Sequence, residues 1–460
     1  MGSRRADVDH ERGVATPAVF AGVVAGLMVA ATIREGAFYP ADAALVLVVS
    51  LVVATGLLLI GPDKRAVVVV AGLGGLALWW LVRAAAQGRA GSFLPLGASI
   101  IGFGCAFLAT RRLEGRYRVL ATQLVVAVGA VSAAAGLIAT TARWYPLAMP
   151  AQNLWRLSTT LTYSNAAGAL LAVALLAGLG LEQRAALTKL MVCLCAAGLV
   201  ATQSRGAVLG AVVGVLLVPL AQLRRAALTV CLGVLGGLAV VATSSGGSAQ
   251  PLATVAVAFA VVLAVAFPRR GYQVALPAKL TGRFPGGVRK RIALVVVLGL
   301  ATVGIAVGAG LVLRVPIERR VALGSSEDRS YEWSAAIDQW RSSPIVGVGP
   351  DQTLYFHAPD GNFAHFSHNE YLQVLADGGV VGAILLVCTG VCVVRAVRRE
   401  DVASSCATAA LVAFAVAGAL DFDWHLAALG LVGGWVAGLA GRPVAVAPVA
   451  AGPVPDRGGG

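Results

Sequence analysis

Long apolar blocks recur along almost the whole chain, separated by short polar stretches rich in arginine, and they limit what the chain can fold into. A helix needs about 20 predominantly apolar residues to cross the hydrocarbon core of a bilayer, and the blocks have about this length. We therefore expect an all-α, polytopic integral membrane helical bundle of about 12–14 transmembrane helices. The candidate spans are 16–33, 43–61, 66–82, 96–110, 119–142, 166–181, 188–203, 206–223, 227–243, 251–267, 292–315, 378–394, 402–420 and 425–440.

Charge content and charge placement exclude several classes of protein. Only 13% of the 460 residues are charged and 58% are hydrophobic, whereas soluble domains carry about 25% charge. A soluble enzyme, a secreted disulfide scaffold and a disordered regulator are therefore excluded. The net charge of +14 comes from residues scattered between apolar blocks, not from one basic face. It predicts membrane topology and contact with membrane lipids, and no binding of nucleic acid.

The distribution of basic residues orients the bundle. Arginine and lysine gather in loops that alternate along the chain, most of all in 268–291, and such loops face the cytoplasm. We therefore expect a multi-pass protein with a cytoplasmic N-terminus, whose first apolar block is a retained span because another block follows at once. The basic loop 83–91 falls on the outer side and is the one exception.

Five segments follow from this topology. They are a cytoplasmic N-terminal tail (1–15), an N-terminal transmembrane bundle (16–315), an extracytoplasmic catalytic loop containing short helices (316–377), C-terminal transmembrane helices (378–440) and a flexible C-terminal tail (441–460). Long polar loops in compact proteins are usually functional. We expect chemistry in the one large outer loop.

The first half of this outer loop predicts a helix. Ser325 to Asp328 resemble a capping-box start, and Trp333, Ile337 and Trp340 recur at the spacing of one helix face. Tryptophan favours the membrane–water interface, so the helix should lie along the outer surface. Arg329, one turn before Trp333, pairs with Glu332 or Asp328 in one interpretation and binds an anion in the other.

The second half holds a candidate base. Ser367 and Glu370 have capping-box spacing, which places His368 and Asn369 in the first turn of a helix. A helix N-terminus disfavours a protonated imidazole, and a neutral histidine can act as a general base near neutral pH. The alternative is a histidine that only caps the helix. A metal cluster of His357, His365, His368, Asp360 and Glu370 is not expected, because the spacing fixes no third ligand.

Two further polar motifs lie on the predicted outer side. Ser204 and Arg205 begin a span where the distribution of charges disfavours arginine, and a guanidinium group suits phosphate oxygens. The alternative is an arginine that extends to the interface. Asp421 and His425 belong to a short motif between the last two spans, which is either an interfacial turn or part of the same outer cavity.

Together these motifs resemble the O-antigen ligase / O-antigen polymerase family. The resemblance covers about residues 200–395 and rests on Ser204-Arg205-Gly206, Arg329 and Trp333, Pro344–Gly349, His368–Leu372 and Gly378-Gly379, with Asp421–Leu426 near the C-terminus. It implies an inverting, metal-independent glycosyltransferase without cofactor, in a bacterial cytoplasmic (inner) membrane. Such an enzyme transfers a glycan from an undecaprenyl-diphosphate carrier to an acceptor hydroxyl on the outer face.

The resemblance also implies roles for individual residues. Arg205 and Arg329 would bind the diphosphate and His368 would be the base that activates the acceptor. Supporting positions are Ser204, Asn369, Glu370, Tyr371, Trp333, Asp421 and His425. The acceptor is a glycan, a lipid or a protein, and ligase and polymerase both remain open.

Two other classes remain as alternatives. One is a secondary transporter or a lipid-linked glycan flippase, which would need inverted repeats and ionisable residues near the membrane midplane. The other is a structural membrane protein, in which Arg205, Arg329 and His368 would be replaceable. The polar residues gather in one outer loop and the spans are almost free of charge, which favours the enzyme.

Overall fold

The chain folds into a bundle of helices with two small strand pairs. The computed structural model describes residues 2–61, 64–151, 154–183, 185–245, 251–266, 324–352, 355–356 and 363–441. The expected span 292–315, the inner loop 268–291, His357 and Asp360 lie outside the described residues. The helices are α1 (Gly2–Ile33), α2 (Pro40–Leu59), α3 (Lys64–Ala86), α4 (Leu94–Arg111), α5 (Gly115–Ala142), α6 (Ser164–Gly178), α7 (Ala186–Ala201), α8 (Arg205–Val215), α9 (Leu220–Ala242), α10 (Pro251–Ala266), α13 (Gly324–Ser342), α14 (Glu370–Ala396), α15 (Val402–Gly418) and α16 (Ala427–Leu439).

Short elements connect the helices. The 3-10 helices are η1 (Glu35–Ala37), η2 (Ala90–Phe93), η3 (Thr159–Leu161) and η5 (Asp423–His425), and the strands are β1 (Ala148–Ala151), β2 (Leu154–Leu157), β3 (Tyr355–Phe356) and β4 (Phe363–Ala364). Strands β1 and β2 form one antiparallel hairpin, with Ala148 opposite Leu157, and β3 pairs with β4 in a second. The sequence did not predict these strands.

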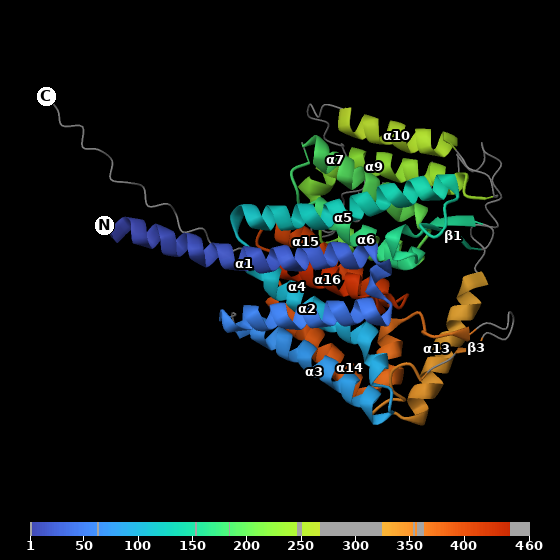
Figure 1. Cartoon of the computed structure of the whole chain (residues 1–460). Coiled ribbons are helices and arrows are strands. Elements are labelled where there is room, and N and C mark those ends of the chain that lie inside the picture. The colour runs from blue at the N-terminus through green and yellow to red at the C-terminus, as the bar shows by residue number, and fades with distance from the viewer. Residues whose placement is uncertain are drawn as a thin grey trace, which may run out of the picture.

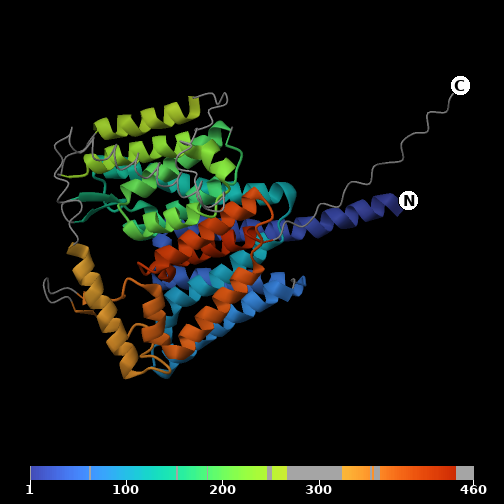
Figure 2. The ribbon, with the colours of Figure 1, turned by 180° about the vertical axis from the view of Figure 1, so that it is seen from behind.

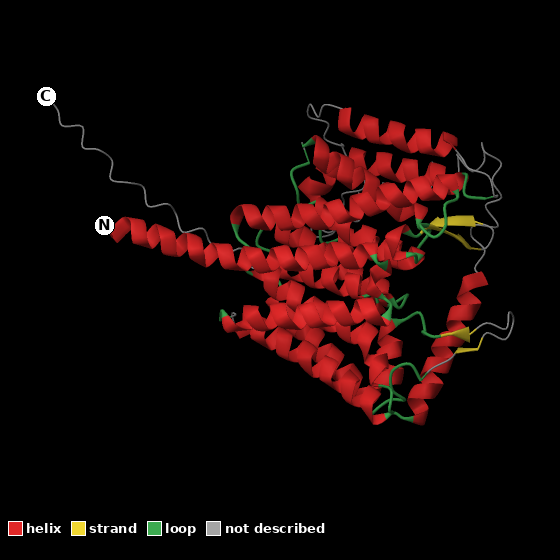
Figure 3. Ribbon diagram, in the orientation of Figure 1, coloured by secondary structure: helices red, strands yellow, loops and turns green. Residues whose placement is uncertain are grey.

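Most of the helices lie side by side with similar axis directions, and α13 crosses one end of them (Figures 1 and 3). The β1–β2 hairpin lies at that same end, which we call the site end, and the N-terminal half of α1 projects from the opposite end. Helices α14 and α15 follow each other in the sequence, but they lie in different parts of the bundle, as the view from behind shows (Figure 2).

Length and composition confirm the expected membrane bundle. Six helical segments are long and apolar enough to cross a membrane, namely Pro40–Leu59, Lys64–Ala86, Ala90–Arg111, Gly115–Ala142, Leu220–Ala242 and Glu370–Ala396. The shorter apolar helices include α6 and α16, in which every residue is buried or nearly so. Expected boundaries were wrong at 206–223, because α8 ends at Val215 and Arg224 and Arg225 lie within α9 rather than in a loop.

The centre of the bundle depends on close contact between α16 and α4. Gly430 and Gly434 of α16 stand one turn apart and face the α4 backbone. A Cβ atom at Gly434 would lie 2.0 Å from the carbonyl oxygen of Phe103, and one at Gly430 would lie 2.3 Å from that of Ser99. Small residues at this spacing let two helix backbones approach closely within a membrane.

Helix α14 is broken near the site end, and the loop after α13 fills the break. Gly379 has φ 63° and ψ −165°, a conformation open essentially to glycine alone. The amide of Val380 donates to the carbonyl of Pro344 at 2.9 Å, and the carbonyl of Ala376 accepts from Val348 at 2.9 Å. The loop thereby satisfies backbone groups that the break would leave unpaired inside the bundle.

The same loop is anchored to the end of α3, which explains the basic segment 83–91. Arg83 donates to the carbonyl of Gly347 at 2.8 Å, and Arg89 donates to that of Asp351 at 3.3 Å. These arginines therefore bind backbone of the protein itself at the site end. The basic segment 83–91, which was the exception to the expected distribution of charges, therefore has a structural role in holding the loop after α13.

Candidate active site

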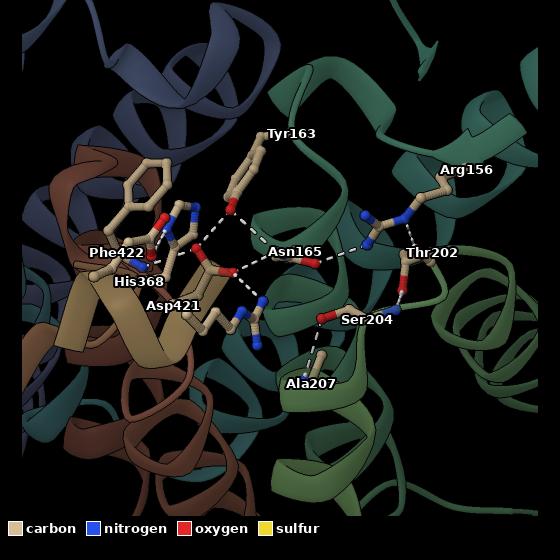
Figure 4. A network of polar contacts seen from close by, with 11 residues as sticks. Arg156, Tyr163, Asn165, Thr202, Ser204, Ala207, His368, Asp421 and Phe422 are labelled. Carbon is tan, nitrogen blue, oxygen red and sulfur yellow. Dashed lines mark hydrogen bonds and ion pairs between the residues drawn. The ribbon is translucent and has the colours of Figure 1, made fainter. Parts of the chain in front are cut away.

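Polar side chains from five parts of the chain meet at the site end. They come from α13, the segment before α14, the turn between α15 and α16, the segment from β2 to the start of α6, and the start of α8. Figure 4 shows Asp421, Tyr163, Asn165 and Arg156 joined by hydrogen bonds, with His368 beside Phe422. The expected residues Arg329, His368 and Asp421 are thus brought together, although their sequence positions span both sides of α14.

Asp421 connects this group. Its side chain is buried, and it accepts hydrogen bonds from the hydroxyl of Tyr163 at 2.6 Å and from the amide of Asn165. Arg329 Nη2 lies 3.6 Å from Asp421 Oδ2, an ion pair that the sequence analysis did not predict, while the side chain of Asp328 lies outside the described residues. Burial, followed by the nearby charge of Asp421, raises the pKa of the Tyr163 phenol well above its usual range. Tyr163 is therefore a hydrogen-bond donor.

Arg156 is a functional candidate that the sequence analysis missed. Its Nη2 donates to Asn165 Oδ1 at 2.8 Å, and its Nε donates to the carbonyl of Thr202 at 3.0 Å. Burial is the main cause that lowers the pKa of Arg156, and the positive charges of Arg329 and Arg205 lower it further. The charge of Arg156 therefore interacts unfavourably with those of Arg329 and Arg205, and a bound anion would offset this repulsion. The sequence feature that could have identified Arg156 is its position on the predicted outer side, where the distribution of charges disfavours arginine.

Arg205 is the first residue of α8, and its side chain is exposed. The preceding Ser204 is the N-cap, because its hydroxyl accepts from the amide of Ala207 at 3.3 Å (Figure 4). Ser204 therefore has a structural role that leaves Arg205 at the helix start. The N-terminus of a helix attracts anions, which adds to the positive potential of the arginines.

His368 faces a buried carboxylate. Its Nδ1 lies 2.7 Å from Oε2 of Glu332, which is 2% exposed, while the imidazole remains a quarter exposed. Among the described residues, no hydrogen-bond partner is found for Nε2. Burial alone lowers the pKa of His368, but the hydrogen bond to Glu332 and the charges of Asp421 and Glu332 raise it more, so the pKa lies above the ordinary 6.5.

Two expectations about this segment were wrong. The helix begins at Glu370, and Asn369 is the N-cap whose side chain accepts from the amide of Leu372 at 3.0 Å. Ser367 therefore does not cap the helix, and His368 precedes the first turn with φ 47°. The expected direction of the pKa shift was also wrong, because Glu332, which is 36 residues away along the chain, raises the pKa of His368 where the helix terminus was expected to lower it.

Glu370, Tyr371 and His425 hold the turn that carries Asp421. Glu370 is fully buried and accepts from the amide of Trp424 at 2.5 Å, and Nδ1 of His425 lies 3.3 Å from it. Burial is the largest single effect and lowers the pKa of His425, but the charge and hydrogen bond of Glu370 and the charge of Asp377 together raise it more, so that the net shift is upward. Tyr371 donates to the carbonyl of Ala415 at 2.9 Å. These residues position the site rather than line it.

The same turn carries a second buried acid. Burial, followed by the charges of Asp421 and Glu370, raises the pKa of Asp423 well above its usual range. Its Oδ1 has no hydrogen-bond partner among the described groups. Of the two carboxyl groups on this turn, Asp421 is the one that forms the ion pair with Arg329.

Stacked aromatic rings form one wall of the site. The ring of Phe422 stacks on Phe366 with centroids 4.5 Å apart and on Tyr163 with centroids 4.9 Å apart. His368 meets the Phe422 ring edge to face at 5.2 Å. This stack fixes the plane of the imidazole, and the sequence analysis did not predict it.

Helix α13 contributes through a different face from the one expected. Its predicted extent is confirmed, but Glu332 and Ala336 are the residues buried against α14, while Trp333 is only half-buried. In the described part of the chain, no group of three histidine, cysteine, aspartate or glutamate side chains is arranged to hold a metal ion.

Comparison with known proteins agrees with the resemblance seen in the sequence. Residues 232–387 match the family model described as O-antigen ligase, and no curated protein matches the chain. The matched region includes Arg329, Glu332 and His368, whereas Arg205 and Asp421 lie outside it. The chain therefore carries a region that matches the O-antigen ligase family, which supports the expected family assignment and an O-antigen ligase-like function in polysaccharide biosynthesis.

Proposed function

We propose that the protein is a membrane glycosyltransferase that transfers a glycan from an undecaprenyl-diphosphate carrier to an acceptor hydroxyl. The observation that carries this proposal is the meeting of a histidine–carboxylate pair with three arginines at one end of a membrane bundle. A diphosphate leaving group needs cations, and an acceptor hydroxyl needs a base. The site holds both.

The diphosphate occupies the space between Arg156, Arg205 and Arg329. Arg329 is about a quarter exposed and lies 3.6 Å from Asp421, which is longer than a charge-assisted hydrogen bond. It can therefore turn to a phosphate at little cost. Arg156 is held by two hydrogen bonds and provides a fixed positive charge. The α8 N-terminus adds backbone amides at the same place.

The base is His368. The acceptor oxygen attacks the anomeric carbon of the glycan and forms the new glycosidic bond, while the bond from that carbon to the phosphate oxygen breaks. The acceptor proton passes to Nε2 of His368, and Glu332 stabilises the resulting imidazolium through Nδ1. Undecaprenyl diphosphate leaves with the electron pair of the broken bond. A single displacement of this kind inverts the anomeric configuration and routes no step through a metal.

The site end faces the outside of a bacterial cytoplasmic membrane, and the N-terminus lies in the cytoplasm. Arginines gather at the opposite end of the bundle, where Arg118 donates to the carbonyl of Gly441 at 2.9 Å and Arg111 to that of Ala396 at 3.1 Å. They cap the C-terminal ends of α16 and α14 and also satisfy the positive-inside rule.

Reconstitution tests the proposal. The purified protein is placed in proteoliposomes with an undecaprenyl-diphosphate-linked oligosaccharide and a polysaccharide acceptor, and both glycan transfer and released undecaprenyl diphosphate are measured. We expect H368A to lower the rate by about 100-fold or more, as loss of a general base does. The matched control is H365A, because His365 is exposed and lies three residues away.

Turnover by H368A at the rate of the H365A control would refute the catalytic role. Transport is the alternative, since a broken membrane helix such as α14 is also found in transporters. In this chain, however, backbone of the loop after α13 fills the break. Counterflow of substrate in the same proteoliposomes, unchanged in H368A and without any transfer, would favour a transporter or flippase.

A further inference from the structure

An apolar cavity of about 690 Å³ lies among α3, α4, α14, α15 and α16. Its walls are mostly aliphatic, as at Leu73, Ile100, Val393 and Leu411, which come from four different helices. Because several helices enclose it, the cavity differs from the ordinary lipid-facing surface of a single helix.

The two ends of the cavity differ in chemistry. Tyr371 and Trp424 line the end near the candidate active site. The other end lies just after α14 and is lined by Arg398 and Arg399. Among the described residues that line the cavity, these two carry the charged side chains. Arg398 is half-buried, and Arg399 is exposed, with one contact from its Nη2 to the carbonyl of Leu217 at 3.2 Å. An apolar cavity with a cationic mouth matches a molecule with a long hydrocarbon chain and an anionic head.

We propose that this cavity binds one acyl chain of an anionic phospholipid, whose phosphate lies at Arg398 and Arg399. Basic pockets between transmembrane helices bind anionic lipid head groups, and a chain together with a basic patch gives stable association where either alone does not. The carrier lipid is a poorer occupant, because its diphosphate belongs at the arginines of the site end, at the opposite end of α14 from Arg398.

The bound lipid also supports the active-site turn. Its chain ends beneath Tyr371 and Trp424, and the Trp424 amide donates to Glu370, which holds the turn carrying Asp421. Filling the cavity therefore limits the motion of that turn from below, since protein interiors resist voids.

Native mass spectrometry of the delipidated full chain tests the proposal. Phosphatidylglycerol and phosphatidylcholine with identical acyl chains are titrated separately into the protein in neutral detergent. We expect one phosphatidylglycerol to be retained at least tenfold more tightly than phosphatidylcholine. In R398Q/R399Q this retention should fall by about 10- to 30-fold, because each basic residue near an anionic surface contributes about fivefold. In R398Q alone, the retention of phosphatidylglycerol should fall by about fivefold.

A second variant blocks the chain rather than the head group. Gly390 lines the cavity, and a Cβ atom there would meet nothing within 4 Å, so G390L adds a four-carbon side chain to the cavity wall and its Cβ meets no neighbouring atom. It should lose retention of phosphatidylglycerol. The matched controls are G26L, where a Cβ atom also meets nothing within 4 Å, and R116Q/R395Q, which removes two exposed arginines.

Equal retention of both phospholipids by the unchanged protein would overturn the proposal. So would wild-type retention in G390L and in R398Q/R399Q, or co-purification of a polyprenyl lipid that phosphatidylglycerol does not displace. Binding is read without any transfer reaction, so the result is independent of the proposed enzymatic activity.

Discussion

Replacement of Glu332 by glutamine isolates the charge that acts on His368. Glu332 is 2% exposed, and its Oε2 lies 2.7 Å from Nδ1 of the imidazole. Glutamine keeps the shape and one oxygen but removes the negative charge. A hydrogen bond between charged groups is worth about 1.5–3 kcal/mol.

The sign of the effect follows from the direction of the present shift. Glu332 raises the pKa of His368, so E332Q should lower it. The neutral, basic form of the imidazole then persists to lower pH, and the acidic limb of the pH–rate profile moves to lower pH. The plateau rate should fall by about 10- to 100-fold, because the weaker base accepts the proton less readily and the imidazolium loses its partner.

The assay is glycan transfer in proteoliposomes, measured from about pH 5 to pH 9 around the ordinary imidazole pKa. D338N is the matched control, because Asp338 lies on the same helix, is exposed and pairs with Arg341. It should leave both the limb and the plateau unchanged. An acidic limb that stays in place in E332Q, or that moves to higher pH, would refute the role assigned to the pair.

Three further outcomes follow from the structure. R156Q should raise the KM for the lipid-linked donor by about tenfold while changing kcat less, measured in the same assay, because Arg156 contributes one charge to the diphosphate site. G379A should destabilise the fold by about 1–3 kcal/mol, because alanine is strained at φ 63° and its Cβ would lie 2.3 Å from a carbonyl oxygen. Thermal unfolding measures this loss of stability, and the control variant G390A should unfold at the same temperature as the unchanged protein. R83Q should expose the loop after α13 to faster hydrogen exchange, because it removes a 2.8 Å hydrogen bond to the loop backbone.

The membrane bundle was predictable because one local property, apolar length, determines which segments cross a bilayer. Apolar length does not determine which helices pack against each other. Arg156 was missed for this reason, since its partners Asn165 and Thr202 are adjacent to it only after β2, α6 and α7 pack together. The break in α14 was likewise visible only as two neighbouring glycines.

The wrong prediction for His368 has a quantitative cause. A helix terminus shifts a nearby charge by about 0.3–1 kcal/mol, and it was the only effect visible from the local sequence. A short hydrogen bond to a buried carboxylate is worth about 1.5–3 kcal/mol and has the opposite sign. Glu332 was visible on α13, but its expected partner was Arg329 on the same helix face. The competition was decided by packing of α13 against α14.

Several arginines lie at the site end, where the expected orientation predicts few of them, and three of these arginines have an identifiable role. Arg83 and Arg89 bind carbonyls of the loop after α13, and Arg156 bridges two segments beside Asp421. An arginine on the disfavoured side of a membrane protein carries a cost in topology, so its retention indicates a task there. By this reasoning, R205Q and R329Q should weaken donor binding more than removal of an arginine at the opposite end does.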